Sequence, residues 1–234
     1  MEINRNLTPE KLAGMMDHTF LKAYAVRSDF EKLCSEARSY GFAMVAINSG
    51  PVKLCKELLT GTGVHVGAAI SFPLGQMAIE SKLSETRQAI EDGADEIDYV
   101  LNIGALKMGN DAYIQHEMKS MVSLCHQSGV LCKVIFENCY LTKEEIARAA
   151  RIAAEVRPDF IKTSTGFGPS GAVPEDVALM KEIVGSQVRV KAAGGIRTWD
   201  TCRLMLEAGA ERIGTSNSVH ICEEYKLLYR NLQS

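Results

Sequence analysis

Two lysines lie in segments that resemble buried strands. Lys162 lies in residues 159–164 (DFIKTS) and Lys191 in residues 188–194 (VRVKAAG), and each segment leads into a loop that contains glycine. Lysine is almost never fully buried without a partner, so both positions need an explanation. The carboxyl ends of strands in a closed α/β barrel carry the active site, which makes a chemical role for the pair reasonable.

An amine that lies close to another cation can lose its proton and become a nucleophile. At about 4 Å and an effective dielectric constant of about 20, two ammonium groups repel by about 4 kcal/mol. This repulsion lowers the pKa of one lysine by roughly three units from about 10.4, and burial acts in the same direction. One of the two lysines is therefore predicted to form a Schiff base with a carbonyl substrate.

Further charged residues share the face of these lysines. Side chains of a strand alternate between its two faces. The alternation predicts that Glu96, Asp98, Asn102, Lys133, Glu137 and Arg189 point into the barrel together with Lys162 and Lys191. Asp98 is expected to deliver and remove protons, while Asp17 either extends this relay or pairs with a lysine. The alternative is a purely structural network of ion pairs.

Small residues follow the last three strand-like segments. Glycine lets the backbone approach an anion closely, and the peptide N–H groups at helix starts favour phosphate. The predicted phosphate and substrate contacts are Thr165, Gly166, Gly194, Gly195, Ser216 and Asn217. Glycine is also common in ordinary turns, so the prediction depends on the position of these loops after successive strands.

Eight strand-like segments alternate with helical ones along the chain. The segments are residues 15–20, 42–48, 64–71, 96–102, 131–137, 159–164, 188–194 and 211–216. Helix starts are indicated by Pro174 and by the S/T-x-x-E patterns at Ser28 and Thr142. Strands separated by helices run parallel, which predicts a single (β/α)₈ TIM barrel over residues 1–234, with a short helical extension at about 8–15. An open doubly wound sheet is the alternative.

Composition excludes several kinds of partner. The 234 residues are 46% hydrophobic with a formal net charge of −3, and no run of basic residues suggests nucleic acid or a membrane surface. Without an apolar stretch of about 18 residues or a signal peptide, we expect a cytoplasmic protein. The seven cysteines form no C-x-x-C pair and the five histidines show no metal-ligand spacing, so neither a disulfide framework nor a metal is expected.

Several motifs together resemble the deoxyribose-phosphate aldolase family. They are DHT at 17–19, GADEIDYVLNIGAL at 93–106, KVIFE at 133–137, FIKTSTGFG at 160–168 and VKAAGGIRT at 190–198. The resemblance implies a class I aldolase without a cofactor, in which Lys162 forms the Schiff base and Lys191 lowers its pKa. Asp98 would then relay protons, with Asp17 assisting. The implied reaction is reversible cleavage of 2-deoxy-D-ribose 5-phosphate to acetaldehyde and D-glyceraldehyde 3-phosphate, and the likeness also implies a homodimer.

Departures from the family pattern affect the substrate more than the mechanism. Ala46 stands where the family usually has cysteine, Asn138 where threonine is commoner, and Asn217 where a second serine is usual in the last loop. Two alternatives stay open. One is a Schiff-base aldolase of a different phosphorylated sugar, and the other is a phosphosugar-binding barrel without catalysis.

Overall fold

Eight parallel strands close into one barrel in the computed structural model, which describes residues 7–231. The strands are β1 (Met16–Thr19), β2 (Met44–Asn48), β3 (His65–Ile70), β4 (Glu96–Val100), β5 (Leu131–Ile135), β6 (Phe160–Lys162), β7 (Arg189–Ala193) and β8 (Arg212–Thr215). Each lies within one of the predicted segments. β8 pairs with β1, with Met16 opposite Ile213, so the predicted (β/α)₈ barrel is confirmed and the open sheet is wrong.

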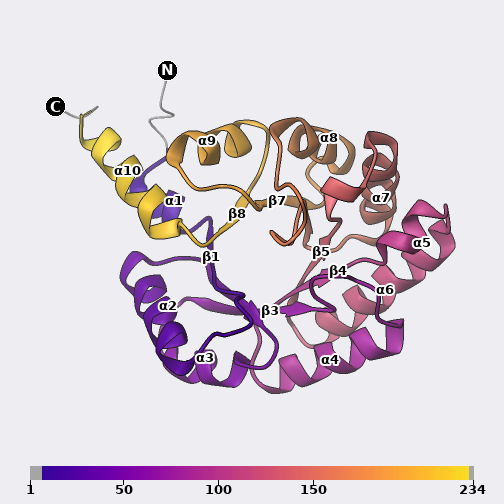
Figure 1. Cartoon of the computed structure of the whole chain (residues 1–234), viewed down its shortest axis with the longest axis horizontal. Coiled ribbons are helices and arrows are strands. Elements are labelled where there is room, and N and C mark those ends of the chain that lie inside the picture. The colour runs from indigo at the N-terminus through magenta and orange to yellow at the C-terminus, as the bar shows by residue number, and fades with distance from the viewer. Residues whose placement is uncertain (1–6, 232–234) are drawn as a thin grey trace.

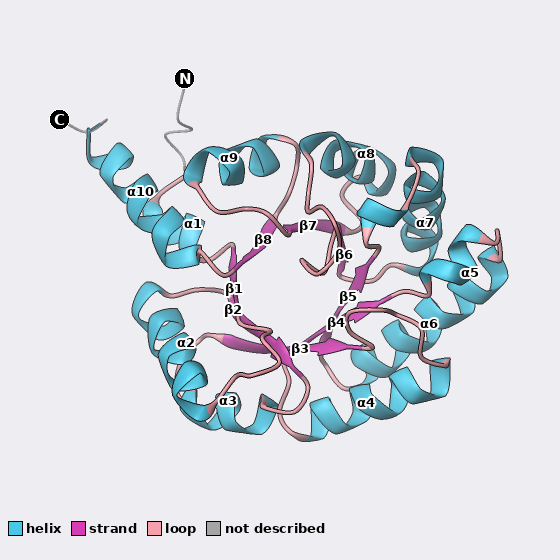
Figure 2. Cartoon of the chain, in the orientation of Figure 1, coloured by secondary structure: helices cyan, strands magenta, loops and turns pink. Residues whose placement is uncertain are grey.

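Helices surround the strands on the outside (Figure 2). They are α1 (Pro9–Ala13), α2 (Arg27–Tyr40), α3 (Val52–Leu58), α4 (Ile79–Glu91), α5 (Ile103–Lys107), α6 (Asp111–Gln127), α7 (Lys143–Val156), α8 (Pro174–Val184), α9 (Trp199–Glu207) and α10 (Ser218–Asn231), with a 3₁₀ turn η1 (Asn138–Tyr140). α1 lies within the predicted N-terminal extension and beside α10 (Figure 1). There, the Tyr225 hydroxyl donates to the Leu7 carbonyl at 2.5 Å.

Local sequence explains where several helices begin. Thr142 caps α7 as predicted, because its hydroxyl accepts from the Glu145 N–H and the Glu145 carboxylate accepts from the Thr142 N–H. α8 begins at Pro174, also as predicted. The pattern at Ser28 is not the cap of α2. That helix begins at Arg27, and the Asp29 carboxylate accepts from the Val26 N–H at 2.9 Å instead.

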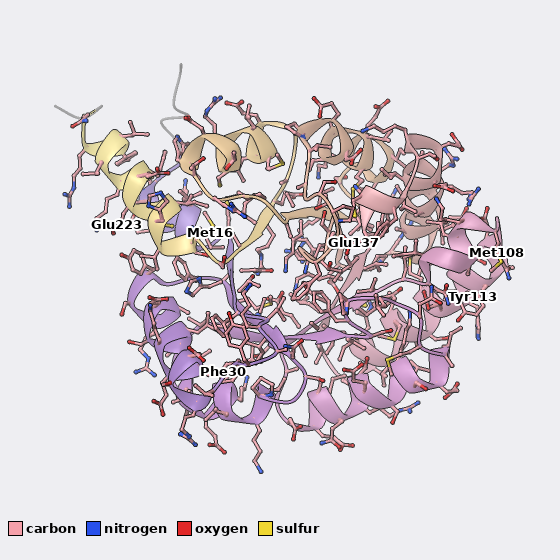
Figure 3. All side chains as sticks on the ribbon, viewed as in Figure 1. Met16, Phe30, Met108, Tyr113, Glu137 and Glu223 are labelled. Atoms are coloured by element: carbon pink, nitrogen blue, oxygen red, sulfur yellow. The ribbon has the colours of Figure 1, made fainter. Side chains whose placement is uncertain are left out.

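The hydrophobic core lies between the strands and the helices. Outward-facing side chains such as Tyr99, Val134 and Phe136 are fully buried there. Met16 is likewise buried, whereas Met108 lies at the outer edge and is 79% exposed (Figure 3). Because the apolar faces turn outward, the alternate faces of the same strands turn polar side chains into the barrel.

The loops after β6 and β7 are held together by direct backbone contact. A Cβ atom on Gly171 would lie 2.1 Å from the Gly194 carbonyl oxygen, so a larger residue does not fit. The Ala172 N–H also lies 3.1 Å from the Ala193 carbonyl and 3.0 Å from the Gly194 carbonyl. This contact fixes the two glycine-containing loops beside each other at the mouth of the barrel.

Candidate active site

Ion pairs inside the barrel form a closed ring of three cations and three carboxylates. The ring runs from Asp98 to Lys133, Glu96, Arg212, Asp17, Lys191 and back to Asp98. Lys133 Nζ lies 2.7 Å from Asp98 Oδ1, and Lys191 Nζ lies 2.6 Å from Asp98 Oδ2. Buried charges are tolerated when they are paired in this way. His65 binds Glu96 at 2.7 Å beside the ring.

Lys162 is an additional cation attached to this ring. Its Nζ atom lies 2.8 Å from Asp98 Oδ2, the same oxygen that Lys191 binds. With Lys162 protonated, the cluster holds one more positive than negative charge. Lys162 has one carboxylate partner, whereas Lys191 has two, in Asp17 and Asp98. Lys162 is therefore the group that most readily gives up its proton, and the cluster becomes neutral when it does.

The electrostatic surroundings favour a neutral Lys162 amine. Burial is the largest cause that lowers the pKa of Lys162, to about 8; Asp98 opposes this change and Lys191 adds to it. The predicted direction holds, but the main cause is burial and not, as the sequence argument supposed, repulsion between the two lysines. Near neutral pH, an appreciable fraction of this amine is therefore free to attack a carbonyl carbon.

Asp98 is a carboxylate that touches three ammonium groups. Burial alone would raise the pKa of Asp98, but the lysine ammonium groups around it hold that pKa well below its usual value. Asp98 therefore stays ionised and accepts hydrogen bonds from Lys133, Lys162 and Lys191. It can therefore orient the Lys162 amine through the hydrogen bond that this amine donates.

Asp17 takes the simpler of its two expected places. It pairs with Lys191, and its other oxygen accepts from Arg212 at 2.6 Å. Asp17 makes no hydrogen bond or ion pair with Lys162, and it connects to that residue through Lys191 and Asp98. Asp17 therefore holds Lys191 in place.

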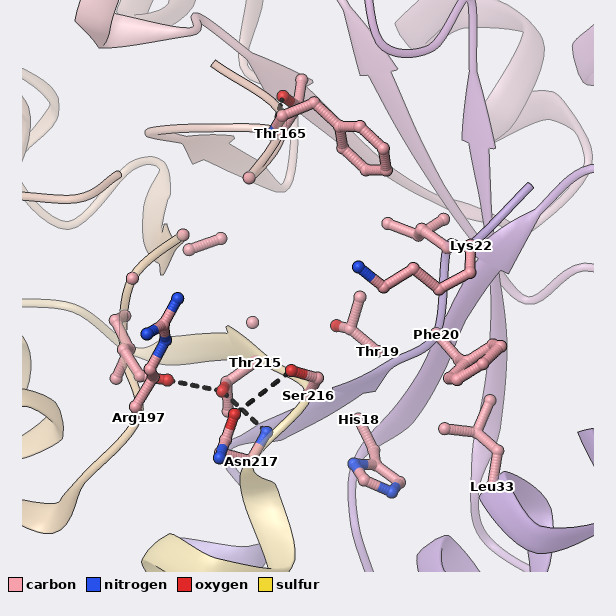
Figure 4. Close-up of a pocket in the computed structure, with 18 of the residues that line it drawn as sticks. His18, Thr19, Phe20, Lys22, Leu33, Thr165, Arg197, Thr215, Ser216 and Asn217 are labelled. Carbon is pink, nitrogen blue, oxygen red and sulfur yellow. Dashed lines mark hydrogen bonds between the residues drawn. The ribbon is translucent and has the colours of Figure 1, made fainter. Parts of the chain in front are cut away.

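A cavity of about 620 Å³ has Lys162 among its lining residues. All six predicted phosphate and substrate contacts line it: Thr165, Gly166, Gly194, Gly195, Ser216 and Asn217. Figure 4 shows Thr165 on one side of this cavity and Ser216 and Asn217 on another. A volume of this size suits a small phosphorylated substrate.

Two residues expected on the inward charged face lie elsewhere. The Asn102 side chain follows β4 and caps α5, because it accepts from the Ala105 N–H at 3.0 Å. Arg189, by contrast, faces into the barrel as predicted, where its guanidinium stacks on the Phe160 ring at 3.9 Å without joining the ion-pair ring. Glu137 lies beyond the end of β5 with a left-handed φ of 58°, so the strand alternation no longer applies to it.

Glu137 instead positions the loop after β6. Its carboxylate accepts from the Thr165 N–H at 3.0 Å and from the Thr165 hydroxyl. The Thr165 hydroxyl in turn accepts from the Phe167 N–H at 3.0 Å. Glu137 thus holds in place one of the loops that border the cavity.

Sequence reasoning missed four residues at or beside the site. The strand alternation, extended to the last strand, indicates Arg212 of β8. Lys22, Arg197 and His18 line the cavity from loops or strand ends. His18 binds Glu36 at 2.8 Å, a contact that the DHT motif does not predict.

The departures from the family pattern fall at different distances from the cavity. The Asn138 side chain is buried against Met180 of α8, at 3.4 Å from its sulfur, and does not line the cavity. Asn217 does line it, and its Oδ1 atom lies 3.2 Å from the Ser216 hydroxyl. Ala46 lies in β2, buried, opposite Thr19 of β1.

Two features are absent from residues 7–231. No group of three or more His, Cys, Asp or Glu side chains in this range could hold a metal ion. In the same part of the chain, no helix is long and apolar enough to cross a membrane.

Most of the chain matches one known family, described as DeoC/LacD family aldolase, over residues 11–217. The chain belongs to this family. This chain is 54% identical over 231 residues to a deoxyribose-phosphate aldolase from Bacteroides thetaiotaomicron. The match covers 99% of this chain and 97% of that protein. It is also 58% identical over 219 residues to a deoxyribose-phosphate aldolase from Lactobacillus acidophilus. That match covers 94% of this chain and 92% of the relative.

A solved structure resembles the DeoC/LacD aldolase over nearly its whole length. This is a deoxyribose phosphate aldolase from Aeropyrum pernix, described as a tetramer, with a TM-score of 0.85 and 31% identity over 94% of this chain and 93% of that one. The predicted family and the predicted class of enzyme, an aldehyde-lyase, are confirmed. The alternative of a binding barrel without catalysis loses its support.

Proposed function

We propose that this aldolase reversibly cleaves 2-deoxy-D-ribose 5-phosphate to acetaldehyde and D-glyceraldehyde 3-phosphate through a Schiff base on Lys162. The position of Lys162 is the main support for this proposal. Its amine has a pKa lowered to about 8, lies 2.8 Å from Asp98 and borders the cavity. The names of the relatives from Bacteroides and Lactobacillus support the substrate.

The chemistry begins at the neutral Lys162 amine. It attacks C1 of the open-chain sugar, and loss of water from the carbinolamine gives an iminium ion. Breaking the C2–C3 bond sends its electron pair into the iminium and leaves an enamine, while the C3 hydroxyl gives up its proton and becomes the aldehyde of the phosphorylated product. Protonation at C2 and hydrolysis then release acetaldehyde. We assign Asp98 the proton exchange at the Lys162 nitrogen.

Lys191 and Asp17 support this chemistry without forming the imine. Lys191 shares an oxygen of Asp98 with Lys162, so it stabilises the ionised carboxylate and disfavours a proton on Lys162. Asp17 binds Lys191 and keeps it in this place. The loops that carry Gly166, Gly194 and Ser216 would bind the phosphate group through backbone N–H groups and small polar side chains.

Substrate identity is tested by comparing cleavage rates. We expect rapid cleavage of 2-deoxy-D-ribose 5-phosphate, with acetaldehyde and D-glyceraldehyde 3-phosphate measured as separate products. Ribose 5-phosphate and ketose phosphates should react far more slowly. Faster cleavage of a ketose phosphate would favour the other candidate, a Schiff-base aldolase of a different phosphorylated sugar.

The pKa of Lys162 predicts how activity depends on pH. Only the neutral amine attacks the aldehyde, and a pKa of about 8 means that the neutral fraction rises as the pH increases through that value. We expect the rate of imine formation with acetaldehyde to rise about tenfold per pH unit below pH 7 and to level off above about pH 9. A rate that stays constant from pH 6 to pH 9 would contradict this assignment.

Ala46 predicts resistance to a reactive aldehyde. The family usually presents a cysteine at this position, whereas here the buried Ala46 leaves no thiol in β2. We expect crotonaldehyde to inactivate this enzyme at least about tenfold more slowly than its Ala46→Cys variant, because the thiolate is the nucleophile that such compounds capture. Residual activity is measured after timed incubation. Equal inactivation of both proteins would overturn this expectation.

The remaining proposals concern assembly and location. The family likeness favours a homodimer, although the Aeropyrum relative is described as tetrameric. Light scattering after size-exclusion chromatography would give the mass of the assembly. We propose a cytoplasmic location and small phosphorylated sugars and aldehydes as partners, on the basis of the sequence and the aldolase family.

A further inference from the structure

The charged residues that line the cavity differ in whether their side chains have hydrogen-bond or ion-pair partners within the protein. Both cavity carboxylates have partners within the protein. Asp29 accepts from the Val26 N–H at 2.9 Å, and Glu36 accepts from His18 at 2.8 Å. Glu36 also faces Lys32, four residues earlier on α2, at 3.9 Å. Lys32 thus opposes the charge of Glu36, and the main chain at the start of α2 engages Asp29.

Two cavity cations lack such compensation. Among the described residues, the Lys22 amine and the Arg197 guanidinium have no hydrogen-bond or ion-pair partner, and both residues are exposed. They come from different walls, Lys22 from the segment after β1 and Arg197 from the loop after β7. Figure 4 shows both side chains extending into the cavity from opposite sides. The space between them is a favourable place for an anion.

The backbone on either side of Lys22 is held at the barrel rim. The Phe20 N–H donates to the Ala46 carbonyl at 3.0 Å, which ties the segment to β2. The Ala25 N–H donates to the Lys22 carbonyl at 3.1 Å and closes a turn. Lys22 is thus anchored beside the cavity at its main chain, while its long side chain remains free to reach a ligand.

We infer that Lys22 is a specificity-determining residue, which binds the substrate phosphate from the wall opposite the glycine-containing loops. The inference rests on the proposed function and adds a residue that the sequence motifs do not indicate. The loops after β6, β7 and β8 offer neutral backbone donors and one cation, Arg197, so a phosphate dianion needs a second positive charge from another wall. An unpaired ammonium group supplies this charge, and its flexible stem allows it to follow the phosphate.

Lys32 provides a matched control in the same cavity. It also lies on the cavity wall, but Glu36 compensates its charge and its side chain is 77% exposed. If any cation at the rim attracted the substrate through general electrostatics, Lys22→Met and Lys32→Met would have similar effects. If Lys22 contacts the phosphate, the effects separate.

The test compares 2-deoxy-D-ribose 5-phosphate with unphosphorylated 2-deoxy-D-ribose. Lys22→Met is expected to lower the ratio of their kcat/KM values about ten- to hundredfold, mainly through the KM of the phosphorylated sugar. Lys32→Met should change this ratio less than about twofold, and Lys22→Arg should restore most of it. An unchanged ratio in Lys22→Met, or equal changes in both methionine variants, would overturn the inference.

A binding measurement separates this inference from the proposed function. Inorganic phosphate is titrated into the parent and both methionine variants by calorimetry, which requires no turnover. We expect about tenfold weaker binding in Lys22→Met alone, and binding equal to that of the parent would refute the role of Lys22. Failure of the parent to cleave 2-deoxy-D-ribose 5-phosphate would instead refute the proposed substrate, and the phosphate titration would still decide the role of Lys22.

Discussion

Replacing Lys162 by methionine is expected to lower aldolase turnover by on the order of 10⁴-fold or more. The reason is that, within residues 7–231, no other amine is placed to replace it. Lys191 binds the same Asp98 oxygen, but Asp17 also binds it, so its amine is held between two carboxylates. Turnover is measured with 2-deoxy-D-ribose 5-phosphate, and imine formation by borohydride reduction in the presence of acetaldehyde.

Mass spectrometry shows where the aldehyde becomes attached. Peptide mapping of the reduced parent protein should place an added ethyl group on Lys162, and the Lys162→Met variant should carry none. Lys32→Met, altered at the rim of the same cavity, should still form the adduct. An ethyl group on Lys191 in the parent protein, or none on either lysine, would refute the assigned nucleophile.

The same variant should keep its fold. The ring already contains three cations and three carboxylates, and Lys162 is one further cation attached to it. Removing Lys162 therefore leaves no unpaired buried charge. We expect the Tm of Lys162→Met to equal or exceed that of the parent, since a surplus buried charge is costly and a methionine of similar length fills the space. A large fall in Tm would mean that the lost activity reflects damage to the fold.

Alternation of strand side chains predicted much of the site because β4 to β7 are regular. Asp98, Lys133 and Lys191 all lie inside the barrel where the alternation placed them. The rule failed for Asn102 and Glu137 because both lie beyond the ends of their strands, where the backbone turns. A sequence pattern with a period of two carries no information past the last ladder residue.

Partner choice within the barrel could not be read from the sequence. Lys133 and Lys191 have the same chemistry and the same orientation, yet only Lys191 shares an Asp98 oxygen with Lys162. Which lysine approaches which carboxylate depends on how far the strands are staggered around the closed barrel. The dominant effect of burial on the Lys162 pKa likewise depends on how tightly the site is enclosed, which the residue types do not determine.

Replacing Lys191 by methionine is expected to restore the proton to Lys162. In the parent, four cations face three carboxylates, and the cluster becomes neutral when Lys162 loses its proton. Without Lys191, three cations face three carboxylates, so the cluster is neutral only while Lys162 keeps its proton. The pKa of Lys162 should therefore rise from about 8 by at least about one unit, which corresponds to about 1.4 kcal/mol.

The expected rise is measured as a shift in the pH dependence of imine formation. Borohydride trapping with acetaldehyde at a series of pH values should give a midpoint at least about one unit more alkaline in Lys191→Met, with turnover near pH 7 reduced by at least about tenfold. Lys191→Arg keeps the cation and should keep the midpoint close to that of the parent. A Lys191→Met enzyme that loses activity while its midpoint stays in place would show that Lys191 acts on a later step, because its charge would then have no effect on the proton of Lys162.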